Sequence, residues 1–394
     1  MNKFSLLTIL FMTPAMAQEP SPSPTAISAT NSETMQKLYK TLTAILTDSS
    51  CEERFCSKDS HDRVAEELKT LSSLSHLMKS KEYSGDKADP TLSILSGYLY
   101  DEVNAANSAF KAGKSEYART LIHALPSTCI ACHSRNETGP QFDQLAFEPT
   151  DTSLKPIEKA EFYAATRQFD RAEKGFLAII NSGESASNDP YTWEHAIQQS
   201  LTIAVRVKKD PQLAKKIIDS ALEQKKAAVY VKEDLQQWKK SVQAWLKEPK
   251  RTVASEKGFY NEGARLISEA HQLQKYPMDH SADVLYLRAS SAYYDLIQFA
   301  PNGNHVSEAL LMQGICNEVL NPRGFEDLHR LYYEACIKKT PHSFVALDCY
   351  RRYERSTVLG YTGSGGTAVP EEVKQKLLDL FSQSVSNGNG GKVY

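Results

Sequence analysis

One short stretch, Cys129-Ile130-Ala131-Cys132-His133, restricts the fold of this chain more than any other. Cys-x-x-Cys-His is the attachment signature of c-type haem. Two cysteines three positions apart lie on one side of a helical turn, so both sulfurs can bond to the vinyl groups of one haem. The adjacent histidine then places its imidazole beneath the iron as the proximal ligand. We therefore expect one covalent haem c, held by Cys129 and Cys132, with His133 as iron ligand.

The same five residues allow three other interpretations: a thioredoxin-like Cys-x-x-Cys, half of a zinc site, or chance. A thioredoxin motif follows a strand and opens a helix, and no strand pattern precedes Cys129. A zinc site needs a second pair of ligands, and none lies nearby in the sequence. Chance is disfavoured because the chain also carries an export signal, as a protein with c-type haem should.

That signal is at the N-terminus. Lys3 is a short positive region, the mostly apolar run 4–12 comes next, and Ala15-Met16-Ala17 is a small-x-small cleavage site. We predict a signal peptide over residues 1–17, cleavage after Ala17, and a bacterial periplasm as the destination. The apolar run is too short to span a bilayer, and we expect no transmembrane segment in the mature chain.

Composition predicts an all-α protein that does not bind nucleic acid. The chain of 394 residues has a formal net charge of −2 and no basic tract, which argues against nucleic acid as a partner. It is rich in Ala, Leu, Lys and Glu, with few β-branched runs. These residues favour helices over strands.

Four amphipathic patterns come after a Pro/Ser/Thr/Ala stretch at residues 18–31, which we expect to be a disordered tether. Apolar residues recur at helical spacing over residues 32–46, 61–79, 90–112, and from Ser115 through the haem motif. The connections between them are short. This arrangement predicts an antiparallel four-helix haem bundle over residues 32–138.

From Pro90 to Arg135 the sequence resembles the cytochrome c prime family, the class II c-type cytochromes. The shared features are the turn at residues 110–113 (Phe-Lys-Ala-Gly), an Ala-rich fourth helix, and the motif near its end. Pro126 departs from the pattern and should kink the fourth helix. In that family the first helix makes the distal face, often with an apolar residue that leaves iron five-coordinate. The resemblance implies that Met35 or Leu38 holds that place.

The chain beyond the motif further limits the sixth ligand of the iron. The next methionine after His133 is Met278, which argues against the small class I cytochromes, whose methionine ligand lies some way downstream. Bundle topology places Met35, His76 and Met78 at the haem end. Met35 is the distal candidate, with an ordinary core methionine as the alternative; His76 fits a surface histidine better.

Arg135 is a further candidate site residue, two positions past the histidine. Its guanidinium could pair with a haem propionate, or it could simply belong to a solvated helix end. Among partners, the bundle also leads us to expect a homodimer formed through it.

Seven cysteines leave five after haem attachment. In an oxidising compartment the others can pair. We predict one disulfide between Cys51 and Cys56, in the loop after the first helix. We predict a second between Cys336 and Cys349, which lie at similar heights on a helical hairpin that turns at Pro341; buried thiols are the alternative.

Residues 139–156 contain little periodicity and are typical of a linker, after which we expect a second domain over 157–385 that folds separately. Ala160, Tyr163, Phe169, Ala172 and Phe176 match the spacing of a tetratricopeptide (TPR) unit. A weaker match lies at 214–222. Further helices are predicted at 256–275, 281–299, 306–320, 325–339, 344–359 and 370–381. The pattern fits an irregular TPR-like α-solenoid, with a disordered tail at 386–394.

These features predict a periplasmic monohaem c-type cytochrome, an electron carrier rather than an enzyme, whose TPR-like domain docks a redox partner protein or peptide. No Ser/His/Asp set stands out, so we assign no catalytic residue. One alternative is a five-coordinate haem protein that binds or senses a diatomic gas. A third is a scaffold that bears haem, or a haem peroxidase.

Overall fold

The computed structural model describes residues 24–79, 90–135, 154–249, 254–277, 279–321 and 327–385. The regular structure in these ranges is helical, apart from one hairpin of β1 (Thr362–Gly363) and β2 (Gly366–Thr367). The prediction of an all-α fold is therefore confirmed. No helix in the described ranges combines the length and the apolar character that a bilayer span requires. The predicted signal peptide and C-terminal tail, and nearly all of the predicted linker, lie outside the described residues.

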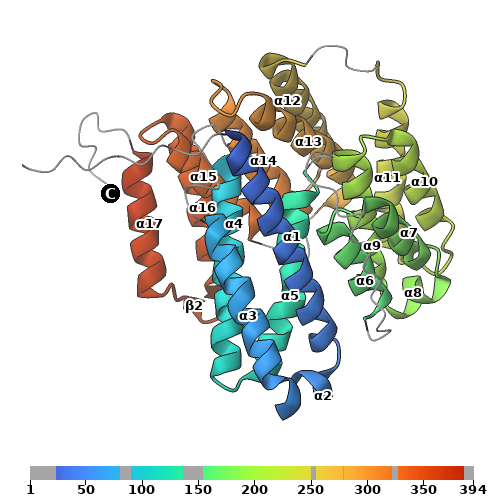
Figure 1. The fold of residues 1–394 in the computed structure, drawn as a ribbon. Coiled ribbons are helices and arrows are strands. Elements are labelled where there is room, and N and C mark those ends of the chain that lie inside the picture. Colours follow the sequence, from blue (N-terminus) through green and yellow to red (C-terminus); the bar gives the residue numbers. More distant parts are fainter. Residues whose placement is uncertain are drawn as a thin grey trace, which may run out of the picture.

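Four long helices, here called the first array, lie side by side in Figure 1: α1 (Pro24–Ser49), α3 (Lys58–Lys79), α4 (Pro90–Lys111) and α5 (Ser115–His133). Helix α1 contacts α3 and α5, α3 contacts α4, and α4 contacts α5. Each helix turns apolar residues at helical spacing inward, as Val64, Leu68 and Leu71 of α3 show. The short helix α2 (Glu52–Phe55) joins α1 to α3.

Helix boundaries in the first array agree closely with the sequence patterns, with one correction. Helix α1 begins at Pro24, earlier than the predicted start at Ser32, so the predicted tether is wrong for residues 24–31. Proline suits a first helical turn because its missing N–H has no partner there in any case. Gly113 ends α4 with φ +73°, as its lack of a side chain allows. Helix α5 continues through Pro126, the residue expected to kink it.

The remaining helices form two further arrays in which consecutive members contact each other. The second array comprises α6 (Pro156–Ala165), α7 (Phe169–Ile180), α8 (Gly183–Asn188), α9 (Pro190–Thr202) with its π-helical continuation η2 (Ile203–Val207), α10 (Pro211–Leu222) and α11 (Val229–Trp245). The third comprises η3 (His280–Ala282), α12 (Glu256–Leu273), α13 (Asp283–Phe299), α14 (Val306–Leu320), α15 (Leu328–Lys339), α16 (Phe344–Gly360) and α17 (Glu371–Ser384).

The first array shares its interior with the other two. One apolar core runs without interruption from α1, α3, α4 and α5 into the second array, where the rings of Tyr39 and Phe162 lie 6.1 Å apart. A second core holds the third array together and takes in Leu95 of α4. Helix α5 contacts α6, and α4 contacts α15. This shared interior is a physical reason for the arrays to depend on one another, whereas the composition of the linker predicted separate folding.

Small residues allow close helix contacts in the second and third arrays. A Cβ added at Gly175 of α7 would lie 2.9 Å from the Ala160 Cβ of α6, so any side chain at this position would push the two helices apart. In the third array, a glycine makes room for an aromatic ring of the neighbouring helix. Tyr333 of α15 packs directly over Gly314 of α14, and its ring is fully buried. Other tyrosines of the third array are also buried in its core: Tyr286, Tyr293, Tyr294 and Tyr332.

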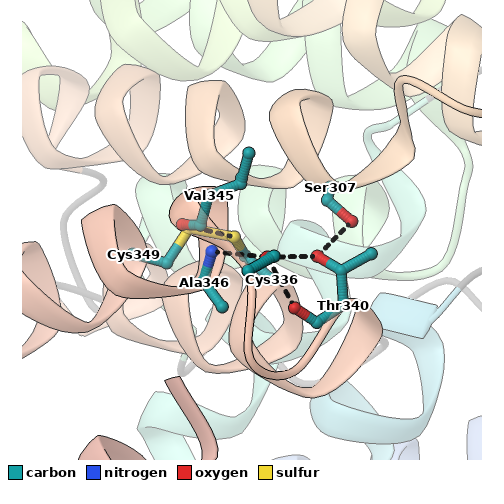
Figure 2. Close-up of a disulfide and its surroundings, with 7 residues drawn as sticks. Ser307, Cys336, Thr340, Val345, Ala346 and Cys349 are labelled. Carbon is teal, nitrogen blue, oxygen red and sulfur yellow. Dashed lines mark hydrogen bonds between the residues drawn. A yellow bond between two sulfur atoms is a disulfide. The ribbon is translucent and has the colours of Figure 1, made fainter. Parts of the chain in front are cut away.

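The disulfide predicted between Cys336 and Cys349 is present, with the two Cα atoms 6.3 Å apart. Figure 2 shows it joining α15 to α16 beside the turn that connects them. Ser343 caps α16, since its hydroxyl accepts a hydrogen bond from the Ala346 backbone N–H at 3.1 Å. Thr340 donates to the Ser307 hydroxyl at 2.9 Å, which ties the same turn to α14.

The disulfide predicted between Cys51 and Cys56 is not formed, and both residues are free thiols. The intervening residues coil into α2, so the two cysteines lie at opposite ends of a helical turn. Residues five apart on a helix also point in different directions. Cys56 instead donates to Glu116 Oε1 at 3.2 Å.

The packing of Tyr333 on Gly314 gives a first prediction. Gly314→Ala places a methyl group inside the Tyr333 ring, and we expect the free energy of unfolding to fall by about 1–3 kcal/mol. Gly360→Ala is the matched control, because nothing lies within 4 Å of an added Cβ at that helix end. Thermal unfolding of both variants checks this. Equal melting temperatures for the two would show that the third array repacks freely.

Candidate functional site

The last turn of α5 presents the motif residues on one side of the helix. At 3.6 residues per turn, positions 129, 132 and 133 fall within about a third of the helix circumference. Cys129, Cys132 and His133 all line the same cavity. The sequence-predicted attachment residues and the predicted proximal ligand are therefore brought together.

The cavity has a volume of about 210 Å³ and lies where the first array meets the end of α6. Leucine is the commonest residue of its wall, and no charged residue is among the described lining residues. The lining residues are Met35, Leu38, Tyr39, Leu42, Leu71, Met78, Leu92, Leu95, Ser96, Leu99, Leu125, Thr128, Cys129, Cys132, His133, Ala165 and Thr166. Such a wall suits a large apolar ring and disfavours a charged substrate.

The His133 imidazole is held in a defined orientation. Its Nδ1 atom lies 2.5 Å from the backbone carbonyl oxygen of Ala165, at the end of α6. Since a carbonyl oxygen only accepts, Nδ1 carries the proton and Nε2 keeps its lone pair. Burial lowers the pKa of His133 to about 4, so the ring is neutral at pH 7. A neutral imidazole anchored through one nitrogen is the form in which histidine binds metals through the other.

The Cys129 side chain is a neutral thiol at pH 7. Burial, with a smaller contribution from the nearby Cys132, raises the pKa of the Cys129 thiol to about 12. A thioredoxin-like nucleophile needs the opposite shift, because its reactivity depends on the thiolate. The thiols, the anchored imidazole and the apolar wall together fit covalent attachment of a haem, with Cys129 and Cys132 as the bonded residues and His133 Nε2 as the ligand.

Some of the candidate distal residues line the cavity and one does not. Met35 and Leu38 of α1 both line the cavity. Met78, at the end of α3, lines it as well. His76 does not, since its ring packs against Tyr100 with centroids 5.3 Å apart.

Arg135 is the site residue whose surroundings differ most from the prediction. It was expected to face a haem propionate, but it is buried and does not line the cavity. Its guanidinium lies 4.5 Å from the ring centroid of Tyr294 on α13. A cation over an aromatic face is attracted by the ring quadrupole, and this contact joins the end of the motif to the third array. The alternative of a solvated helix end is therefore wrong, whereas the pairing of Arg135 with a haem propionate stays a prediction.

Sequence reasoning missed the contribution of α6 to this site. Ala165 and Thr166 line the cavity, although they lie more than thirty positions after the motif and beyond the predicted linker. The TPR-like pattern identified α6 itself, through Ala160 and Tyr163. It gave no signal that the end of that helix would meet His133, because a backbone carbonyl has no sequence signature.

No protein-family model, curated protein or solved structure matches this chain. Among the described residues there is also no group of three or more His, Cys, Asp or Glu side chains that could hold a metal ion. A haem site is not such a group, since the porphyrin nitrogens supply most of the iron ligands and the protein adds one or two.

A second histidine of α5, His123, joins this helix to α1 and α6. His123 lies 3.1 Å from the Ser49 carbonyl oxygen at the end of α1 and 3.4 Å from Glu158 Oε1 in the first turn of α6. The hydrogen bond with Glu158 raises the pKa of His123 above its usual 6.5. The charged imidazolium is therefore favoured by folding.

This linkage predicts the pH dependence of stability. Because the folded pKa is raised, the contribution of His123 is complete below pH 6.5 and is lost as pH rises through the folded value. We expect the melting temperature to fall across that window, and His123→Gln to remove this part of the fall. His61→Gln, which changes an exposed histidine of α3, is the control. An unchanged pH profile in His123→Gln would contradict the linkage.

Proposed function

We propose that this chain is an exported monohaem c-type cytochrome that transfers electrons in the periplasm. The observation that carries the proposal is the meeting of Cys129, Cys132 and His133 at one apolar cavity, with the imidazole already oriented by Ala165. When bound, haem would supply a one-electron Fe(III)/Fe(II) couple. The chain's own residues would hold it through two thioethers, present one nitrogen ligand and exclude water.

The finer architecture belongs to the same proposal. The contacts among α1, α3, α4 and α5 support a cytochrome c prime-like antiparallel bundle. The close approach of α6 and α7 at Gly175 supports a TPR-like hairpin, and helices from α6 onward would dock a redox partner. The disulfide between Cys336 and Cys349 supports an oxidising compartment such as the periplasm.

A second candidate function is favoured by the part of the cavity wall that α1 and α3 supply. Among the lining residues of α1 and α3, the atoms most suited to bind iron are the sulfurs of Met35 and Met78; the rest are leucines and Tyr39. If neither sulfur ligates, these apolar residues would leave the sixth position of the iron open to a diatomic gas. The protein would then bind or sense gas with five-coordinate iron rather than carry electrons.

Covalent attachment gives a direct prediction. The double change Cys129→Ala with Cys132→Ala removes both thioether sulfurs, and we expect complete loss of haem staining on a denaturing gel. The control is Cys51→Ala with Cys56→Ala, which changes two free thiols outside the cavity. Staining that survives the motif change, in a strain competent for haem attachment, refutes the site.

The candidate distal ligands give a further prediction, about the spin state of the iron. We expect Met35→Ala to weaken or abolish any low-spin character, because Met35 lines the cavity, while His76→Ala leaves the spectrum unchanged, because His76 packs on Tyr100 outside it. Visible absorption of the oxidised and reduced proteins measures both. The opposite pattern, with His76→Ala converting the spin state and Met35→Ala silent, would show that the assignment is wrong.

Adding carbon monoxide in the same absorption measurements distinguishes the two candidate functions. A six-coordinate low-spin spectrum that resists carbon monoxide supports electron transfer. A five-coordinate high-spin spectrum that changes at once on adding carbon monoxide supports gas binding.

A further inference from the structure

The end of α6 has a regular capping geometry that leaves one carbonyl group for another partner. Arg167 is left-handed, with φ +60°. The Gln168 N–H donates to the Tyr163 carbonyl at 2.8 Å, and the Arg167 N–H donates to the Ala164 carbonyl at 3.1 Å. These two bonds are the pair that defines a Schellman motif. They satisfy the carbonyls of Tyr163 and Ala164, while the Ala165 carbonyl accepts from His133.

Two hydrogen bonds of opposite direction join this turn to the end of α5. His133 Nδ1 donates to the Ala165 carbonyl at 2.5 Å. The Arg167 Nη1 donates in return to the His133 carbonyl at 3.2 Å. Both the ring and the backbone of His133 are thus fixed by one turn of a helix that belongs to the second array.

Buried hydrogen bonds hold the turn at residues 165–168 in place. The Thr166 hydroxyl donates to the Phe162 carbonyl at 2.8 Å and accepts from Gln168 Nε2 at 2.9 Å. Arg171 in turn donates to Gln168 Oε1 at 3.1 Å. Thr166 and Gln168 are both buried, so these bonds are protected from competing water. The position of the Ala165 carbonyl is therefore set by the second array rather than by α5.

We infer that the turn Ala165-Thr166-Arg167 is a positioning element for the proximal histidine, through which the second array sets the electron donation of His133 to the iron. The inference rests on the proposed function. A hydrogen bond from Nδ1–H to a carbonyl oxygen makes an imidazole a better donor at Nε2. A stronger donor stabilises the ferric state, so the turn holds the reduction potential lower than an unanchored imidazole would.

The test compares two substitutions at one position in the full-length haem protein. Arg167→Gly and Arg167→Val both remove the guanidinium. Arg167→Gly keeps the left-handed turn, because glycine adopts positive φ without strain. Arg167→Val loosens the turn, because a β-branched residue disfavours φ near +60°. We expect Arg167→Val to have a more positive midpoint potential and a lower iron–histidine stretching frequency in resonance Raman spectra than Arg167→Gly.

Lys209 offers a matched control pair, because it is a second basic residue with positive φ, at 49°. Its side chain pairs with Asp295 and does not reach His133. Lys209→Val should strain the protein as Arg167→Val does, but should match Lys209→Gly in potential and stretching frequency. Equal potentials and frequencies for the two Arg167 variants would overturn the inference.

A measurement that needs no haem keeps the inference testable if Arg167→Val fails to fold or the chain takes up no haem. In the full chain with Cys129→Ser and Cys132→Ser, ¹⁵N-histidine NMR reports which ring nitrogen of His133 is protonated, with His133→Gln for assignment. The structure predicts the Nδ1–H tautomer. Protonation at Nε2 instead would overturn the inference, whereas absence of haem from the unmodified chain would overturn only the proposed function.

Discussion

The rest of the site depends on the contact between the last turn of α5 and the end of α6. One hydrogen bond, from His133 Nδ1 to the Ala165 carbonyl, satisfies a carbonyl at the end of one helix and fixes the histidine at the end of another. His123 and Glu158 repeat the connection further along the same two helices. The cavity is closed on this side by Ala165 and Thr166, so its shape depends on how α6 sits against α5.

Apolar burial supplies the stability around that contact, and polar groups supply its geometry. The first array shares its core with the second, and Leu95 of α4 belongs to the core of the third. Leucines and two methionines line most of the cavity, so a bound apolar ring would continue this interior rather than interrupt it. The polar contacts lie at the seams, as Arg135 over Tyr294 shows at the boundary with the third array.

Much of the fold could be predicted from the sequence because helical periodicity and capping residues are local signals. Gly113 and Ser343 mark helix ends as their chemistry requires. The disulfide between Cys336 and Cys349 could be predicted from their equal heights on a hairpin. Cys51 and Cys56 were paired wrongly because a loop was expected where α2 forms. The burial of Arg135 against Tyr294 could not be predicted because Tyr294 is distant in the sequence, and the role of Ala165 was missed because it acts through its backbone.

We propose that the cavity at Cys129, Cys132 and His133 holds one covalent haem. Intact-mass spectrometry of the denatured protein, purified from the periplasm of a strain competent for haem attachment, tests it most directly. We expect the mass of the chain from Gln18 plus one haem, with the added mass retained by the peptide that contains the motif. The mass of the chain alone, with Cys129 and Cys132 both open to alkylation, would contradict it.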